Sequence, residues 1–226
     1  MTDHELLRLH VEAVWGITLS PIEAAVGDVV VAAGAPPWSL YLATLADGSQ
    51  VAIWRADTPA ERRAGLLALA HAAGVHWDEA HAMRREVVFA APDSQAPEHG
   101  QRARELGEAD ATLVEAFEAG SATYFLSPST APCVGVVVDG RLVSVAHSSR
   151  QTTEAYELGI NTALDARRRG YAADAVTLWT QLVQKRGLTP IYSAFAWNDA
   201  SLRLAQSVGF TRRIESVYGQ VPKPEH

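Results

Sequence analysis

Three arginines and a glycine, Arg167–Gly170, stand directly before an apolar helical segment. The first turn of a helix has backbone N–H groups without intrahelical partners, and the helix dipole places partial positive charge there. No Ser, Thr, Asp or Asn immediately precedes this helix to occupy those groups, and Gly170 has no side chain to keep a ligand away. The residues predict an anion site that suits a pyrophosphate. A basic turn in water is the other interpretation.

The spacing of these residues differs from two common phosphate-binding loops. The pattern Arg-x-x-Gly-x-Ala lacks the second and third glycines of the dinucleotide fingerprint and the lysine of the P-loop. Nucleic acid is an unsuitable partner, because the 226-residue chain carries a formal net charge of -7 and phosphate backbones are held by a surplus of Lys and Arg. We therefore expect the phosphate of a small ligand.

Composition excludes several other function classes. The single cysteine, Cys133, excludes an intramolecular disulfide, and the 8 histidines lack the spacing of a zinc site, so no metal site is predicted. No run of about 20 apolar residues is present to span a membrane, and residues 1–15 lack the apolar core of a signal peptide. We predict no membrane partner and a cytoplasmic location.

Strand and helix patterns of an α/β fold surround the basic segment. A strand at Ala155–Thr162 leads into the helix after Gly170, whose apolar residues recur every three or four positions. Phosphate sites in such folds lie where strands end and helices begin. The other elements predicted nearby are a helix at Glu108–Ala119, a hairpin at Pro132–His147 turning on Asp139-Gly140, a strand at Ile191–Trp197, a helix capped by Asn198 or Asp199 and ending near Val208, and a strand at Thr211–Tyr218.

The N-terminal part of the chain has helices and a hairpin of its own. The predicted elements are a helix at Glu5–Trp15, a hairpin at Ser39–Trp54 turning on Asp47-Gly48, a helix capped by Thr58 with Pro59 in its first position and running toward Gly74, and a strand at Arg85–Ala91. Pro92–Gly100 is rich in turn-forming residues and is the predicted linker. We divide the chain into an N-terminal α/β segment at 1–84, of unknown role, and a second domain at 85–226.

Two motifs resemble those of a known family. Arg167–Ala172, RRRGYA, matches the (Gln/Arg)-x-x-Gly-x-(Gly/Ala) acetyl-CoA motif of the GNAT N-acetyltransferases. Asn198–Phe210, NDASLRLAQSVGF, matches their Asn-x-x-Ser-x-x-Leu-Ala-x-x-x-Gly-Phe signature. The longer block HSSRQTTEAYELGINTALDARRRGYA, with PIYSAFAWNDAS, resembles a little-characterised bacterial branch of the family. The resemblance extends from about Cys133 to Tyr218.

The resemblance implies an acyl-CoA-binding α/β fold with a mixed sheet over residues 85–226, and acetyl-CoA as cofactor. It places the pantetheine arm beside the backbone of one strand end and between the two motifs, and the pyrophosphate on N–H groups from Arg168 through Ala173. Asn198 as a helix cap and Ser201 as a first-turn residue in water are the competing interpretations. The cofactor-binding residues so implied are Ile160, Asn161, Thr162, Arg167, Arg168, Arg169, Gly170, Tyr171, Ala172, Ala173, Asn198 and Ser201.

The resemblance also implies direct transfer of the acetyl group to an amine, which requires a base and a proton donor for the departing thiolate. Glu157 is the candidate base, and an exposed strand carboxylate is its alternative interpretation. Many relatives place the proton donor, a tyrosine, where this chain has Ala205. The substitutes considered are Tyr218, which we take as the candidate, Tyr156, Tyr192 and a water. His147 and Arg150 are expected near the substrate, and a surface histidine is the alternative for His147.

Three function classes fit these residues. The first is an acetyl-CoA-dependent N-acetyltransferase that acts on a small-molecule amine or a peptide amino group, an acceptor class that the acidic charge favours. The second is a non-catalytic acyl-CoA-binding sensor or interaction protein, suggested by Ala205. The third is a structural domain whose arginines are solvated. The segment 1–84 either covers the acceptor side of the site or pairs subunits into a homodimer.

Overall fold

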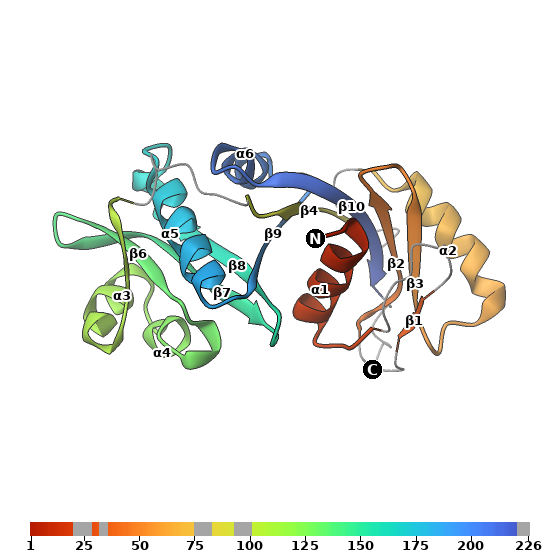
Figure 1. Ribbon diagram of the computed structural model, residues 1–226, viewed down its shortest axis with the longest axis horizontal. Helices are drawn as coiled ribbons and strands as arrows, with labels where there is room; N and C mark the ends of the chain where they lie inside the picture. Colours follow the sequence, from red (N-terminus) through yellow and green to blue (C-terminus); the bar gives the residue numbers. More distant parts are fainter. Residues whose placement is uncertain (20–28, 32–35, 75–82, 93–100, 221–226) are drawn as a thin grey trace. The chain divides into compact units, whose positions relative to one another are not determined.

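The computed structural model describes residues 1–19, 29–31, 36–74, 83–92 and 101–220 (Figure 1). The chain divides into two compact units. The first unit comprises Met1–Phe89, Ser193–Leu202 and Arg212–His226, and the second comprises Ala90–Tyr192 and Arg203–Thr211. Of the predicted linker, Pro92–Gly100, only Pro92 lies within the described ranges, and residues 93–100 lie outside them.

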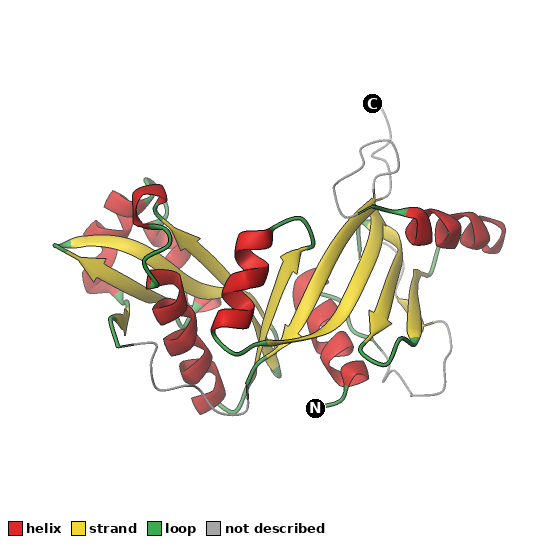
Figure 2. Ribbon diagram, turned by 90° about the horizontal axis from the view of Figure 1, so that it is seen from above, coloured by secondary structure: helices red, strands yellow, loops and turns green. Residues whose placement is uncertain are grey.

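Both units contain helices and strands (Figure 2). The helices are α1 (Asp3–Trp15), α2 (Ala60–Ala72), α3 (Ala111–Phe117), α4 (Ala122–Phe125), α5 (Tyr171–Lys185) and α6 (Asp199–Ser207), with 3₁₀ turns η1 (Glu108–Asp110), η2 (Pro128–Thr130) and η3 (Leu164–Ala166). The strands are β1 (Val29–Val31), β2 (Trp38–Leu45), β3 (Gln50–Arg55), β4 (Met83–Ala90), β5 (Ala103–Glu105), β6 (Val134–Val138), β7 (Arg141–Gln151), β8 (Ala155–Thr162), β9 (Thr189–Phe195) and β10 (Thr211–Gln220). The predicted α/β class with a mixed sheet is confirmed.

In the first unit the strand order is β1-β3-β2-β10-β4. The β2–β3 and β2–β10 pairs are antiparallel, and β1 lies parallel to β3. The β2–β3 hairpin turns at Asp47-Gly48 as predicted, and Gly48 has a φ of 84°. A positive φ carries no steric cost at glycine, so this dipeptide sets the register of the hairpin.

Helices α1 and α2 cover opposite faces of the strands in this unit (Figure 1). Leu40 and Leu42 of β2 pack with Ala70 of α2, whereas the ring of Tyr41, between them, contacts His10 of α1. Successive residues of a strand point to opposite faces, so the two helices are on different sides of β2.

A buried polar network lies under α1. The carboxylate of Glu86 accepts hydrogen bonds from Tyr41 (2.7 Å) and Ser216 (3.2 Å), and its Oε1 is 3.0 Å from Nε2 of His10. Burial raises the pKa of Glu86, but the nearby His10 and these hydrogen bonds outweigh burial and hold the pKa below its ordinary value. The carboxylate is therefore kept ionised inside the apolar first unit.

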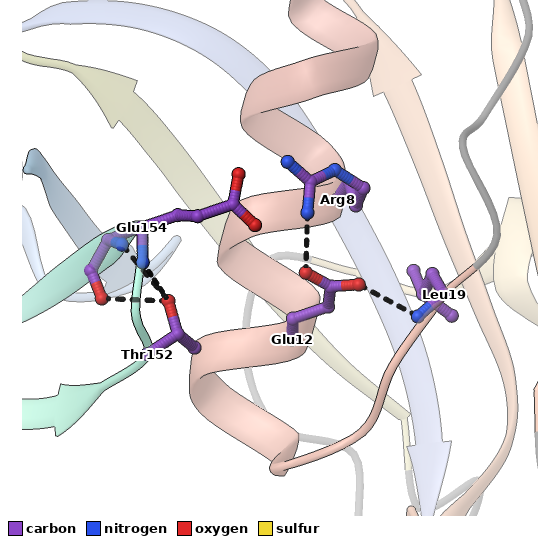
Figure 3. Close-up of polar contacts among 6 residues, drawn as sticks. Arg8, Glu12, Leu19, Thr152 and Glu154 are labelled. Carbon is purple, nitrogen blue, oxygen red and sulfur yellow. Dashed lines mark hydrogen bonds and ion pairs between the residues drawn. The ribbon is translucent and has the colours of Figure 1, made fainter.

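Side chains fix both ends of α1. The hydroxyl of Thr2 accepts from the backbone N–H of Glu5 (3.1 Å), and Gly16 ends the helix with a φ of 62°. Near that end, the carboxylate of Glu12 accepts from Arg8 and from the backbone N–H of Leu19, each at 2.8 Å (Figure 3). The predicted first helix is confirmed because its cap, stop and buried face agree.

The predicted cap of α2 is wrong. The hydroxyl of Thr58 donates to the backbone oxygen of Ser39 (3.1 Å), in a site where Thr58 is buried. Pro59, predicted as the first helical residue, is itself the cap residue, with an extended backbone and no side-chain hydrogen bond to the helix. The hydroxyl predicted to cap the helix forms its hydrogen bond with the backbone of β2 instead.

In the second unit the strand order is β9-β8-β7-β6-β5. Strand β8 lies parallel to β9, and the pairs from β8 to β5 are antiparallel. The β6–β7 hairpin turns on Asp139-Gly140 as predicted, with φ of 49° and 74°. In the β7–β8 turn, the hydroxyl of Thr152 accepts from the N–H groups of Glu154 (3.2 Å) and Ala155 (3.0 Å) (Figure 3).

Helix α5 covers one face of these strands, and α3 with α4 covers the other. The indole N–H of Trp179 on α5 donates to Ser148 of β7 (3.1 Å). The adjacent residue of β7, His147, contacts the ring of Phe125 on α4 instead, with ring centroids 4.9 Å apart. The core on the α3 and α4 side is formed by Leu106, Val114, Phe125, Cys133, Leu142 and Val145.

Candidate functional site

The loop between β8 and α5 ends in the predicted glycine. Gly170 is the residue before the first turn of α5, with a φ of 81°, and its position gives the helix no side-chain cap. Arg168 also has a positive φ, of 60°. This 15-residue helix therefore begins after a glycine with a left-handed backbone. No side chain of the cap residue accepts hydrogen bonds from the first-turn N–H groups.

Arg102, which was not predicted from the sequence as a site residue, packs against this loop from another part of the chain. Arg102 pairs with Asp174 in the first turns of α5, and its Nη1 donates to the backbone oxygen of Arg169 (3.3 Å). Its guanidinium carbon is 4.8 Å from the ring centroid of Tyr171. The Asp174 side chain is 3% exposed and that of Arg102 is 50% exposed, so a buried carboxylate holds a cation that still faces solvent.

The predicted arginines of the loop itself are exposed. Arg167 donates to the backbone oxygen of Thr162 (3.4 Å), which ties the loop to the end of β8. Arg168 and Arg169 are exposed as well. The only acidic residue of the loop, Asp165, pairs with Arg141 of β7 (2.6 Å). The loop therefore presents three exposed cations, and Arg102 adds a fourth.

Strand β8 is paired differently on its two edges. Its antiparallel register with β7 runs from Tyr156 to Thr162, whereas its parallel register with β9 ends at Glu157, opposite Ile191. Backbone groups on the β9 side of Ile160–Thr162 are therefore outside the β8–β9 ladder. A strand edge of this kind has N–H and C=O groups that can bind an extended ligand.

Glu157, the candidate base, is buried at the point where the β8–β9 register ends. Its exposed fraction is 7%. The alternative interpretation of an exposed strand carboxylate is therefore wrong. Its role as a base stays a prediction.

Three other predicted residues belong to the first unit. Tyr218 is buried, and its ring is stacked on Tyr41 with centroids 5.7 Å apart. The side-chain oxygen of Asn198 accepts from the backbone N–H of Ser201 (3.2 Å), so Asn198 caps α6 as its competing interpretation expected. The predicted residues that the structure brings together are thus those of β8, the loop and α5.

A cavity of about 370 Å³ opens in the second unit beside β7 and β8. The segment between α3 and α4 contributes half of its lining residues, and neither α4 nor this cavity was predicted from the sequence. Glu115 on α3 holds that segment, because its carboxylate accepts from the N–H groups of Gly120 (2.7 Å) and Ala122 (3.0 Å). The lining residues are Glu118, Ala119, Gly120, Ser121, Tyr124, Phe125, His147 and Asn161.

His147 is a buried residue in the lining of the cavity. Its Nε2 is 3.2 Å from the hydroxyl of Tyr124. Burial, with a smaller contribution from the charge of Arg150, lowers the pKa of His147 to about 4, so the ring is neutral at pH 7. The residue is 5% exposed, and the surface interpretation is wrong. A Cβ atom at Gly159 of β8 would lie 2.3 Å from Cε1 of His147, so the ring needs glycine at that position.

Two further features bear on the chemistry. Burial raises the pKa of the Cys133 thiol to about 12, so this cysteine is unsuited to act as a nucleophile. Within the ranges that the structure describes, no group of three or more His, Cys, Asp or Glu side chains is arranged to hold a metal ion.

No helix among the described residues is long and apolar enough to cross a membrane.

Solved structures with a similar fold come from several bacteria. A GNAT-family protein of Novosphingobium aromaticivorans is 24% identical, with 62% of this chain and 66% of that chain aligned at a TM-score of 0.47. A GNAT-family acetyltransferase of Colwellia psychrerythraea is 20% identical, with 61% and 56% aligned at 0.49. A ribosomal-protein-alanine N-acetyltransferase of Brucella melitensis is 17% identical, with 53% and 99% aligned at 0.39. This chain thus spans less than two thirds of the first two proteins.

No curated protein matches the chain significantly. The family described as GNAT acetyltransferase matches residues 104–217, just over half of the chain. That match includes β8, the basic loop, α5, the cavity and both sequence motifs. The chain therefore belongs to the GNAT acetyltransferase family.

Proposed function

We propose that the protein is an N-acetyltransferase that transfers the acetyl group of acetyl-CoA to an amine by direct attack in a ternary complex. The observation that carries this proposal is the start of α5, where Gly170 has a left-handed backbone, no side chain caps the helix, and Arg167–Arg169 are exposed. N–H groups from Arg168 through Ala173 are suited to hold the pyrophosphate, because helix N-termini favour anions.

The surroundings of Gly170 fit a phosphate group. A Cβ atom there would lie 2.9 Å from Nη2 of Arg102, so the absence of a side chain lets this guanidinium approach the loop closely. Arginine binds phosphate oxygens through paired N–H groups. Arg102 is therefore proposed as a further phosphate ligand, in addition to Arg167, Arg168, Arg169, Tyr171 and Ala172.

The edge of β8 is the proposed site of the pantetheine arm. Backbone groups of Ile160, Asn161 and Thr162 lie beyond the β8–β9 register and are available to its amides. Asn198 and Ser201 are proposed as further contacts, since a capping side chain can also contact a ligand.

Acetyl-CoA, when bound, supplies a thioester whose acetyl carbon is open to attack by a neutral amine. The chain must remove a proton from that amine, and Glu157 is the proposed base. Its position supports this role, because Glu157 is buried at the point where the β8–β9 register ends, next to the proposed site of the pantetheine arm. Tyr218 remains the proton donor proposed from the sequence, although its ring is buried against Tyr41.

The proposed acceptor is a small-molecule amine or a peptide amino group. The cytoplasmic location and the homodimer are also proposals, and cell fractionation and the mass measured in solution test them. A non-catalytic acyl-CoA-binding protein is the second candidate function. It is favoured by Ala205, fully buried on α6 at the position where many relatives have the donor tyrosine.

Free CoA release, measured against a panel of primary amines and N-terminal peptides, tests the proposal. Release that matches the amount of acetylated acceptor supports the enzyme. Binding of acetyl-CoA without turnover on any acceptor favours the second candidate, and no binding rejects both.

A further inference from the structure

Tyr124 and His147 form a polar pair at the wall of the cavity. Their side chains meet at 3.2 Å, between the hydroxyl and Nε2, and the rings lie edge to face with centroids 5.4 Å apart. Tyr124 is 48% exposed, whereas His147 is 5% exposed. Both residues line the cavity, and the phenol is much more exposed than the imidazole.

The surroundings of His147 select the position of its proton. Nδ1 is buried and has no hydrogen-bond partner among the residues that the structure describes. A buried N–H group without an acceptor is rarer in proteins than a buried acceptor without a donor. The proton of the neutral ring therefore belongs on Nε2, which donates it to the oxygen of Tyr124. The phenolic O–H of Tyr124 is then free to donate to a group in the cavity.

The pair lies beside the strand that carries the proposed pantetheine site. His147 is opposite Gly159 in the β7–β8 register, and its ring lies directly against the β8 backbone at that glycine. Asn161, two residues further along β8, lines the same cavity. A group in the cavity is therefore next to the backbone that the proposed function assigns to the pantetheine arm.

We propose that Tyr124, in place of Tyr218, is the catalytic proton donor of the acetyl transfer and that His147 positions it; this inference rests on the proposed function. The amine nitrogen forms a bond to the acetyl carbon as the carbon–sulfur bond breaks. The sulfur takes the phenolic proton of Tyr124, and the proton lost by the amine returns through the base and water to the phenolate. Nε2–H of His147 holds the oxygen in place and stabilises its transient negative charge.

The Tyr124→Phe variant tests the catalytic role, because it keeps the ring packing and removes only the hydroxyl. We expect kcat to fall about 100-fold or more, within the range of general acid catalysis. The Kd for acetyl-CoA and the KM for the acceptor should change little. A kcat within about threefold of wild type would overturn the inference and leave the proposed function standing. Absence of turnover and of acetyl-CoA binding in the wild-type protein would instead reject the proposed function itself.

Nitrogen NMR of the wild-type protein, labelled at histidine, tests the positioning role without any variant. The expected spectrum at pH 7 shows a protonated Nε2 and an unprotonated Nδ1 for His147, assigned by its loss in His147→Gln. That variant keeps a donor in place of Nε2–H and should retain more of kcat than His147→Leu. A proton on Nδ1 would overturn the arrangement, since Tyr124 would then donate to His147 and not to the substrate.

Discussion

The guanidinium of Arg102 and the carboxylate of Asp174 form an ion pair at the start of α5, although 72 residues separate them in the chain. The carboxylate is buried and the cation half exposed. The pair therefore fixes a positive charge next to Gly170 that the local sequence of the loop does not contain.

Replacing Arg102 with alanine should weaken acetyl-CoA binding about tenfold, which corresponds to ~1.4 kcal/mol. The reason is the loss of one phosphate-binding cation, while the exposed arginines of the loop remain. Calorimetric titration measures the change. Arg104→Ala is the matched control, because Arg104 is an exposed arginine two residues further along, in β5, and pairs with Asp110. Equal loss of affinity in both variants would show a nonspecific charge effect.

The stability of the protein should fall as the pH decreases from 6.5 to about 4, in part through His147. Its pKa is lowered from 6.5 to about 4, so the unfolded chain binds a proton in this range that the folded chain does not. The free energy of unfolding therefore decreases with falling pH, by about 3 kcal/mol for this group at pH 4. Urea unfolding of the wild type and of His147→Gln separates it from the carboxylates. Identical pH profiles would contradict the burial of a neutral ring.

Glu115→Gln should loosen the wall of the cavity. Backbone hydrogen bonds from Gly120 and Ala122 lower the pKa of Glu115, so its contribution to stability is present above the ordinary pKa of a glutamate and is lost as the pH falls through the folded pKa. Amide hydrogen exchange at Gly120 and Ala122 should become faster in the variant at pH 7. Glu108→Gln, in η1, is the control. Unchanged exchange would mean that other contacts hold the segment.

Glu157→Gln should lower kcat at least about 100-fold if the carboxylate is the base, because the amide cannot accept the proton of the amine. The two side chains have nearly the same shape, so acetyl-CoA affinity should be preserved. Parallel measurement of kcat and of the Kd for acetyl-CoA separates the two effects. Full activity of the variant would remove Glu157 from this role.

Much of the fold could be predicted from the sequence, since the relevant signals are local. Asp47-Gly48 and Asp139-Gly140 mark two hairpins, and the periodicity after Gly170 marks α5. The short elements α4 and β5 were missed, because 4 and 3 residues carry too little periodicity to detect. Thr58 failed as a cap because its partner, Ser39, comes from another element.

Part of the candidate site could likewise be predicted from local sequence, and part could not. The loop and β8 were found from contiguous motifs, whereas Arg102, Tyr124 and the cavity arise from segments that meet only in the folded chain. No spacing rule links Arg102 to Asp174 or Tyr124 to His147. A buried histidine opposite a strand glycine, as with His147 and Gly159, is visible only after the β7–β8 register is known.

The most direct test of the central claim is a thermal melt of the wild type and of Gly170→Glu with acetyl-CoA, CoA or ATP. A ligand at about 100 times its Kd stabilises a fold by roughly 2.7 kcal/mol. We predict that both CoA species raise the Tm of the wild type and that ATP does not. None of the ligands should raise the Tm of Gly170→Glu, whose side chain occupies the phosphate site. Gly187→Glu is the matched control, because Gly187 has a φ of 74° at the other end of α5 and open space around it. Equal shifts in wild type and Gly170→Glu, or no shift with either CoA species, would contradict the account.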